Sequence, residues 1–179
     1  MSIVRATAVR TERLVAELPR RSDAEALHTI LGDARVAATL WPGALGGART
    51  LEQVRRMIAN DREHWRTFGF GPWIVREGGR RGRVVGRVGL RTTMVTGDPE
   101  VEVGWVIAAE RWNRGYATEM ARATVATAFG DLGLTELVAF TLPTNHASQA
   151  VMRKAGFVYE RPVEHAGLTH VLYRRSAGQ

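Results

Sequence analysis

Residues 101–142 carry the pattern that most restricts the fold, because they are typical of a strand, a helix and a second strand. Val101–Ile107 and Glu136–Leu142 are rich in β-branched and aromatic residues. Between them a helical periodicity runs from about Arg114 to Leu132, and Gly133 is expected to end the helix. Two strands joined through a helix favour parallel pairing in one sheet. This segment therefore predicts an α/β fold.

The rest of the chain predicts antiparallel strands and three further helices. Gly/Asp/Pro turns such as Thr96–Pro99 join the middle three strands into a meander. Capping boxes at Ser22–Glu25 and Thr50–Gln53 start two helices, and another follows Asn145 and stops at Gly156. The other expected strands are Leu14–Leu18, Trp73–Arg76, Val84–Thr92, Phe157–Arg161 and Thr169–Arg174, and Trp41–Arg49 is expected to be a mobile loop. The predicted fold is a mixed, mostly antiparallel sheet with helices on both faces.

Length and composition restrict the class of protein. The 179 residues suit a single domain, 1–179, in which we expect about the first ten residues to be flexible. The chain has no Cys, which excludes disulfides and thiolate nucleophiles, and its five His residues lack ligand spacing, so no metal site is expected. No apolar run approaches the ~20 residues of a membrane span, and the first residues lack signal-peptide features. We therefore expect a cytoplasmic protein without a membrane partner.

The positive charge favours an anionic ligand more than a nucleic acid. The formal net charge is +7, and all but one of the 25 basic residues are arginine, Lys154 being the single lysine. These residues are spread along the whole chain, a distribution more typical of a codon bias than of a basic binding face. Nucleic acid is therefore not an expected partner, although a docking role on RNA or a ribosome remains a third hypothesis.

A turn rich in small residues follows the strand that ends at Ile107. The turn leads into the long helix and has the sequence Trp112-Asn113-Arg114-Gly115-Tyr116-Ala117-Thr118. The first amides of a helix lack internal partners and suit phosphate oxygens. Gly115 and Ala117 would leave these amides open, and Arg114 adds charge. The same spacing is equally consistent with a plain tight turn.

A second pattern lies in the last helix. Asn145 suits the N-cap position, and Gly156 suits the position after the helix, with Phe157 folding back on Met152. These capping roles account for the residues without any function.

Together the two patterns resemble the GNAT superfamily of acetyl-CoA-dependent N-acetyltransferases, in particular the branch of ribosomal-protein N-terminal acetyltransferases and their small-molecule relatives. The phosphate-loop signature Gln/Arg-x-x-Gly-x-Gly/Ala is matched by 112–117, and the later signature by Asn145, Ser148, Gly156 and Phe157. Two departures are that Trp112 replaces the first Gln/Arg and that Asn113 stands where this branch often has Gly. Met152 occupies the place of a Tyr that protonates the leaving thiolate in many members.

The resemblance implies a sheet splayed between the strands that end at Ile107 and Leu142. Pantetheine would pair with the backbone of Val106 and Ile107, and the pyrophosphate would bind the amides from Arg114 to Thr118. The implied cofactor-binding residues are Val106, Ile107, Asn113, Arg114, Gly115, Tyr116, Ala117, Thr118 and Asn145. No metal takes part.

The implied reaction is direct attack of an amine on the acetyl thioester, with Glu102 as the candidate base. Glu102 lies two residues before Gly104 and so shares a strand face with Gly104 and Val106. Partial burial would raise its pKa toward neutrality, although a solvent-facing strand Glu is the alternative. Glu100 and Glu119 are weaker candidates, and Glu119 is expected to pair with an Arg or face solvent.

Ser148 is the best-placed hydroxyl to assist the leaving thiolate, as an acid or through a hydrogen bond. The acceptor would be a protein N-terminal amine or a small-molecule amine, in a pocket built from Trp41–Arg49, the helix that carries Trp65, and Val163–Leu168. The alternative function is a non-catalytic acyl-CoA-binding or regulatory domain of the same fold, because the Tyr is missing at Met152. A monomer and a homodimer are both compatible with the sequence.

Overall fold

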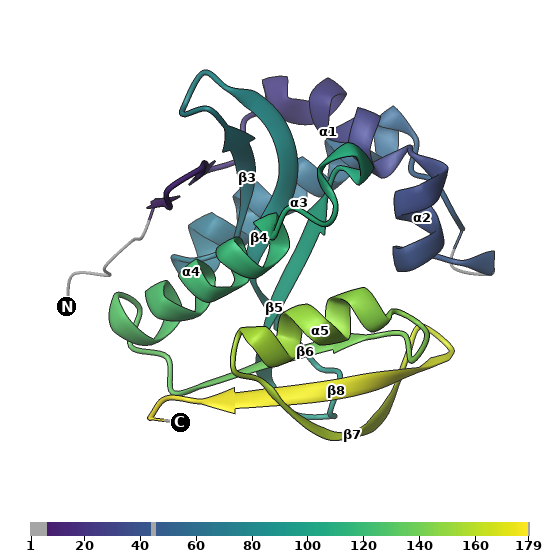
Figure 1. Cartoon of the computed structure of the whole chain (residues 1–179), viewed down its shortest axis with the longest axis vertical. Coiled ribbons are helices and arrows are strands. Elements are labelled where there is room, and N and C mark those ends of the chain that lie inside the picture. The colour runs from purple at the N-terminus through teal and green to yellow at the C-terminus, as the bar shows by residue number, and fades with distance from the viewer. Residues whose placement is uncertain (1–6, 44–45, 179) are drawn as a thin grey trace.

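A computed structural model describes residues 7–43 and 46–178 (Figure 1). The described residues form an eight-stranded sheet of order β1-β2-β3-β4-β5-β6-β8-β7. Among the strands of the described residues, only β5 and β6 pair in parallel, as the strand–helix–strand pattern predicted. The strands are β1 (Ala8–Arg10), β2 (Leu14–Glu17), β3 (Pro72–Glu77), β4 (Arg83–Thr93), β5 (Glu100–Ile107), β6 (Glu136–Thr141), β7 (Val158–His165) and β8 (Leu168–Ser176). The prediction of a mixed, mostly antiparallel sheet is confirmed.

Helices cover both faces of the sheet. They are α1 (Ala24–Leu31), α2 (Ala34–Leu40), α3 (Leu51–Phe68), α4 (Tyr116–Gly130) and α5 (His146–Lys154), with short 3-10 turns at Arg21–Asp23 and Ala109–Arg111. In Figure 1, α4 and α5 lie in front of the sheet, and α3 passes behind it. Alternation along β5 separates two cores, since Val106 packs with α1, α2 and α3, whereas Val103 packs with α4 and α5.

The pairing of β5 with β6 is short, and this creates the opening that holds the site. The two strands are in register at Glu102 and Val138 alone. Beyond Glu102 they diverge, as the upper and lower halves of the sheet do in Figure 1. The predicted splay is therefore present.

Local capping signals gave mixed results. Thr50 Oγ1 accepts from Gln53 N at 3.3 Å and Gln53 Oε1 accepts from Thr50 N at 2.8 Å, so this capping box is confirmed. The prediction of a capping box at Ser22–Glu25 is wrong. Instead Asp23 accepts the backbone N–H of Arg20 at 2.8 Å, and α1 begins one residue later, because the short 3-10 turn comes first.

The sequence analysis missed two elements, β1 and α2. The N-cap of α2 is Asp33, whose Oδ1 accepts from Arg35 N at 2.8 Å, a local signal that could have revealed the helix. Trp41–Arg49 follows α2 and forms neither an α-helix nor a strand in its described part, and residues 44–45 lie outside the described residues. Residues 1–6 of the expected flexible start also lie outside them.

The bounds of α4 differ from the expectation by two residues at each end. Gly115 is the N-cap with φ 78°, a left-handed conformation that closes the turn before the helix. At the other end Leu132 N donates to Thr127 O at 3.0 Å, so the chain leaves the helical ladder after Gly130. Gly133, expected to end the helix, lies in the following turn with φ 64°.

Candidate active site

The backbone of β5 directs polar groups into the opening between β5 and β6. Ala108, directly after the strand, donates its N–H to a carbonyl of β4 at 2.8 Å. Because polar groups alternate in direction along an antiparallel strand, those of Val106 face β4, and those of Trp105 and Ile107 face the opening. The indole Nε1 of Trp112 donates to Ile107 O at 2.8 Å. The groups that face the opening thus differ from the expected pair, Val106 and Ile107, whereas the side chain of Val106 lines the opening.

The turn before α4 presents backbone amides at the same opening. Asn113 and Gly115 both have positive φ, 59° and 78°. The intrahelical ladder begins only at Glu119, whose N–H donates to Gly115 O at 2.9 Å, and no side chain in the described part of the chain caps this N-terminus. The amides of Tyr116, Ala117 and Thr118 are therefore left for an anion, in the field of a positive helix end.

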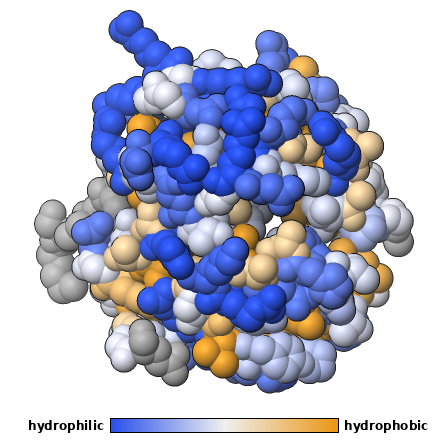
Figure 2. Space-filling view, in the orientation of Figure 1, coloured by the Kyte–Doolittle hydropathy of each residue, from blue (hydrophilic) through white to orange (hydrophobic). Residues whose placement is uncertain are grey.

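These groups border a groove with a volume of about 420 Å³. It runs from the turn before α4 to the start of α5. Its lining includes every expected cofactor-binding residue except Arg114, and Figure 2 shows this face of the molecule hollowed between its upper and lower halves. The expected residues in the lining are Val106, Ile107, Asn113, Gly115, Tyr116, Ala117, Thr118 and Asn145.

The groove continues into an inner pocket of about 180 Å³ that holds both candidate catalytic residues, Glu102 and Ser148. The two spaces share Leu40, Trp105, Val106 and Ser148. An elongated ligand in the groove could therefore place one end beside Glu102.

Glu102 is half-buried at the inner pocket, on the strand face of Gly104 and Val106. A Cβ placed on Gly104 would lie 3.5 Å from Glu102 Oε1, so the missing side chain leaves room beside the carboxylate. Burial raises the pKa of Glu102 to about 7, against the opposing effect of Arg87 and Arg91 on the adjacent strand. A carboxyl with this pKa exchanges protons near neutral pH, which suits a base.

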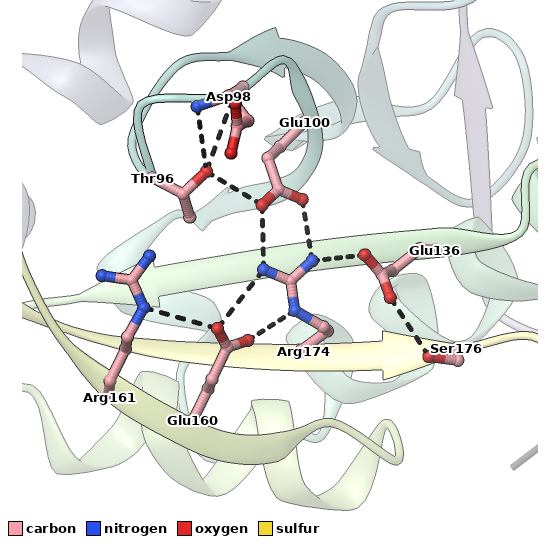
Figure 3. Close-up of polar contacts among 8 residues, drawn as sticks. All are labelled: Thr96, Asp98, Glu100, Glu136, Glu160, Arg161, Arg174 and Ser176. Atoms are coloured by element: carbon pink, nitrogen blue, oxygen red, sulfur yellow. Dashed lines mark hydrogen bonds and ion pairs between the residues drawn. The ribbon is translucent and has the colours of Figure 1, made fainter.

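Glu100 is unsuitable as a base because Arg174 holds it as a carboxylate. Arg174 donates to both oxygens of Glu100 at 2.8 Å, and Thr96 Oγ1 donates at 2.9 Å. These bonds lower the pKa of Glu100, with Arg174 the largest cause. Figure 3 shows the guanidinium of Arg174 enclosed by Glu100, Glu136 and Glu160, a network that ties β5, β6, β7 and β8 together.

Glu119 is also unsuitable as a base, because Arg13 and Thr11 bind its carboxylate. The expectation that it pairs with an Arg is confirmed. Arg13 Nε donates to Glu119 Oε2 at 2.8 Å, and Thr11 Oγ1 donates to Oε1 at 2.5 Å. Arg13 also donates to Arg114 O at 2.9 Å and lies over the Tyr116 ring at 4.7 Å. The turn between β1 and β2 therefore braces the start of α4 and neutralises the acid nearest the amides.

The start of α5 is built as its sequence predicted. Asn145 Oδ1 accepts from Ser148 N at 3.0 Å, which orients the first turn, and Asn145 Nδ2 donates to Thr39 O of α2 at 3.3 Å. Phe157 N donates to Met152 O at 3.0 Å, and both side chains are buried in one core. Met152 also touches the inner pocket, where its thioether can donate no proton.

Several groove residues escaped the sequence analysis. They come from the missed helix α2 and from positions outside the two signatures, namely Val36, Thr39, Leu40, Arg111, Ala147, Val151 and Lys154. A helix signal at Asp33 could have found the first three. Arg111 lies in the 3-10 turn after β5, and the last three require the packing of α5 against the opening. Trp65 packs on Trp73 with centroids 5.3 Å apart, so these two rings fill the core instead of lining the acceptor side.

Other kinds of site find little support in residues 7–43 and 46–178. Within these ranges no three His, Asp or Glu side chains cluster in a way that could hold a metal ion. None of the helices in the described part of the chain combines the length and apolarity needed to cross a bilayer. His64, one of the isolated histidines, is buried and accepts from Thr92 N at 3.1 Å, a core role.

Sequence comparison identifies the domain. Residues 13–158 match the acetyltransferase (GNAT) domain family. An uncharacterized protein of Bacillus subtilis is 26% identical over 131 residues, covering 73% of this chain and 76% of that protein. The FsC-acetyl coenzyme A-N(2)-transacetylase of Aspergillus fumigatus is 36% identical over 97 residues, covering 51% of this chain and 40% of that protein.

Solved structures share the whole architecture. An acetyltransferase from Agrobacterium tumefaciens superposes with a TM-score of 0.79 at 26% identity, covering 95% of this chain and 94% of that one. A ribosomal-protein-serine acetyltransferase described for Vibrio cholerae gives 0.74 at 20% identity, covering 99% and 100%. The Microcin C7 self immunity acetyltransferase, solved with acetyl-CoA and AMP, gives 0.73 at 13% identity, covering 98% and 99%. With its groove, helix terminus and family match, the chain belongs to the GNAT acetyltransferase family and is an acetyl-CoA-dependent acetyltransferase.

Proposed function

We propose that the protein is an N-acetyltransferase that moves the acetyl group of acetyl-CoA to a primary amine, on a protein N-terminus or on a small molecule. The observation that carries this proposal is the inner pocket, where Glu102 and Ser148 meet at the end of a groove that begins at the amides of α4. A base and a hydroxyl at the inner end of a groove that begins at unpaired helix amides suit acyl transfer.

The groove suits CoA in both of its parts. The amides from Arg114 to Thr118 would bind the pyrophosphate, with the positive φ of Asn113 and Gly115 shaping the turn around it. Lys154 lines the same groove and adds positive charge. Pantetheine would run along β5 as an added strand and pair with the N–H of Ile107 and the carbonyl of Trp105, which face the opening, while the carbonyl of Ile107 accepts from Trp112 Nε1.

The chemistry follows from an amine and a thioester meeting at Glu102. An alkyl amine has a pKa near ~10 and arrives protonated. Glu102 would take its proton, directly or through one water, and the amine nitrogen would then attack the acetyl carbonyl. The new C–N bond forms as the C–S bond breaks and the electron pair leaves on sulfur. The N–H of Trp105, which faces the opening at the inner pocket, would stabilise the developing charge on the carbonyl oxygen.

Ser148 would assist the departing thiolate. It lies in both the groove and the inner pocket, and Asn145 fixes its position at the start of α5. An alkyl thiolate leaves readily near neutral pH, so a hydrogen bond from the Ser148 hydroxyl is sufficient.

Thiol release from acetyl-CoA, measured against a panel of small amines and peptide N-termini, tests the proposal. Turnover with at least one amine supports it. Calorimetric binding of CoA without turnover toward every amine would instead favour the non-catalytic acyl-CoA-binding domain. Transfer is proposed to need neither metal nor nucleic acid, so added chelator or nuclease should leave the rate unchanged.

A further inference from the structure

A recess lined by three arginines lies beside the inner pocket. It has a volume of about 320 Å³, and its walls come from α3, from the residue preceding the N-cap of α3 and from β4. Gln53, Arg56, Met57 and Asn60 recur on α3 at the spacing that places side chains on one helix face. The complete lining, hereafter the arginine recess, is Arg49, Gln53, Arg56, Met57, Asn60 and Arg91.

The charge of the arginine recess is not fully neutralised by the protein. Arg56 is paired with Glu52 on the helix surface. Arg91 Nη1 donates to Asp61 at 3.0 Å. The fully buried Asp61 carboxylate also accepts hydrogen bonds from both Nε and Nη2 of Arg87 at 2.7 Å. One carboxylate thus faces two guanidinium groups, and the Arg91 side chain remains 40% exposed.

Arg49 has no acidic partner among the residues that the structure describes. Its guanidinium carbon lies 4.0 Å from the centre of the Trp41 ring, a cation–π contact that holds the side chain without neutralising it. Its backbone N–H donates to Leu31 O at 3.0 Å, so the position of the chain at Arg49 does not depend on its charge.

The arginine recess and the inner pocket are adjacent. Met57 lines both, and Trp41, the partner of Arg49, lines the inner pocket. Arg91 lies opposite Glu102 in the register of β4 and β5, so both side chains project from the same sheet face. A molecule whose amine reaches Glu102 from this side would bring its other end to Arg49 and Arg91.

We propose that the arginine recess binds an anionic group of the acceptor, so that the substrate is an amine that also carries a carboxylate or a phosphate. This inference rests on the proposed transfer to an amine at Glu102. The guanidinium of Arg49 would donate to the anionic group, and Arg91 would add charge from the opposite wall. Neutral amines would bind without these contacts and would be poorer substrates.

The test compares matched acceptors that differ only in the anionic group. Suitable pairs are an amino acid with its amide, and phosphoethanolamine with ethanolamine, so that the two arms distinguish carboxylate from phosphate. We expect at least one anionic member to have the higher kcat/KM. Arg49→Gln should lower that kcat/KM about tenfold, mainly through KM, and leave the neutral member and CoA affinity unchanged. Arg55→Gln, an exposed change on α3 outside the recess lining, is the matched control and should change neither.

Equal use of both members of each pair, or an equal loss for both in Arg49→Gln, would overturn the inference while leaving acetyl transfer intact. A second measurement is independent of turnover. With CoA saturating, so that the amides of α4 are occupied, calorimetry should detect inorganic phosphate binding that Arg49→Gln weakens and Arg55→Gln keeps. If no amine accepts the acetyl group, the proposed function is wrong. If inorganic phosphate does not bind either, the proposal that the arginine recess binds an anionic group is also wrong.

Discussion

Replacing Glu102 by Gln tests the proposed base and its environment in one variant. Gln is nearly isosteric, so the inner pocket keeps its shape and acetyl-CoA affinity should remain unchanged. Turnover should fall by ~10²-fold or more, the usual contribution of a positioned base. Because the pKa of Glu102 is about 7, the rate of the wild type should rise with pH through neutrality, and this limb should be lost in the variant.

The same variant should alter stability in a pH-dependent way. The folded pKa of Glu102, about 7, lies above its ordinary value of 4.5, so between these values the folded state binds more protons than the unfolded state. Wild-type stability contributed by this group therefore falls as pH rises from about 4.5 to 7. The two pKa values differ by about 2.5 units. At about 1.4 kcal/mol for each unit, the loss reaches about 3 to 4 kcal/mol above pH 7. Gln does not titrate, so Glu102→Gln avoids this loss. Between pH 4.5 and pH 8 the free energy of unfolding of the variant should therefore rise by that amount relative to the wild type.

Urea unfolding at a series of pH values measures this difference, and Glu100→Gln is the matched control. The pKa of Glu100 is lowered by Arg174, so its stabilising effect is present above its ordinary pKa and lost in acid. The control should therefore lose stability at pH 8, the opposite sign. Turnover of Glu102→Gln within a factor of about three of wild type would refute the role of base, and a pH-independent stability difference would refute the raised pKa.

Three further changes test other parts of the site. Gly115→Glu places a negative charge at the amides of α4, where φ is 78°, and should abolish CoA binding in calorimetry with the far-UV circular dichroism retained; unchanged affinity would reject the phosphate site. Ser148→Ala should reduce turnover about tenfold at constant acetyl-CoA affinity, and a wild-type rate would show that the thiolate leaves unaided. Asp61→Asn leaves Arg87 and Arg91 without their buried carboxylate and should cost about 3–5 kcal/mol in urea unfolding, whereas a loss below about 1 kcal/mol would contradict the importance of this cluster.

The parts of the site that the sequence predicted depend on hydrogen bonds between near neighbours. Asn145 caps Ser148 three residues on, and Phe157 bonds back to Met152 across Gly156. Such contacts close within one helical turn, so residue types at fixed spacing are enough to predict them. The failure at Ser22 shows the limit of this reasoning, since Asp23 one residue later offered a competing carboxylate.

By itself, the sequence determined the order of the elements other than β1 and α2, the mixed sheet, the helix terminus with unpaired amides, and the strand face of Glu102. Only the tertiary structure decided which groups meet across long stretches of chain. Trp112 reaches Ile107 O, and the pKa of Glu102 depends on burial beneath elements that lie far away in the sequence. The arginine recess joins Arg49 to Arg91 in the same way. Periodicity records which side of an element is apolar, but the distances between elements arise only when their side chains pack together.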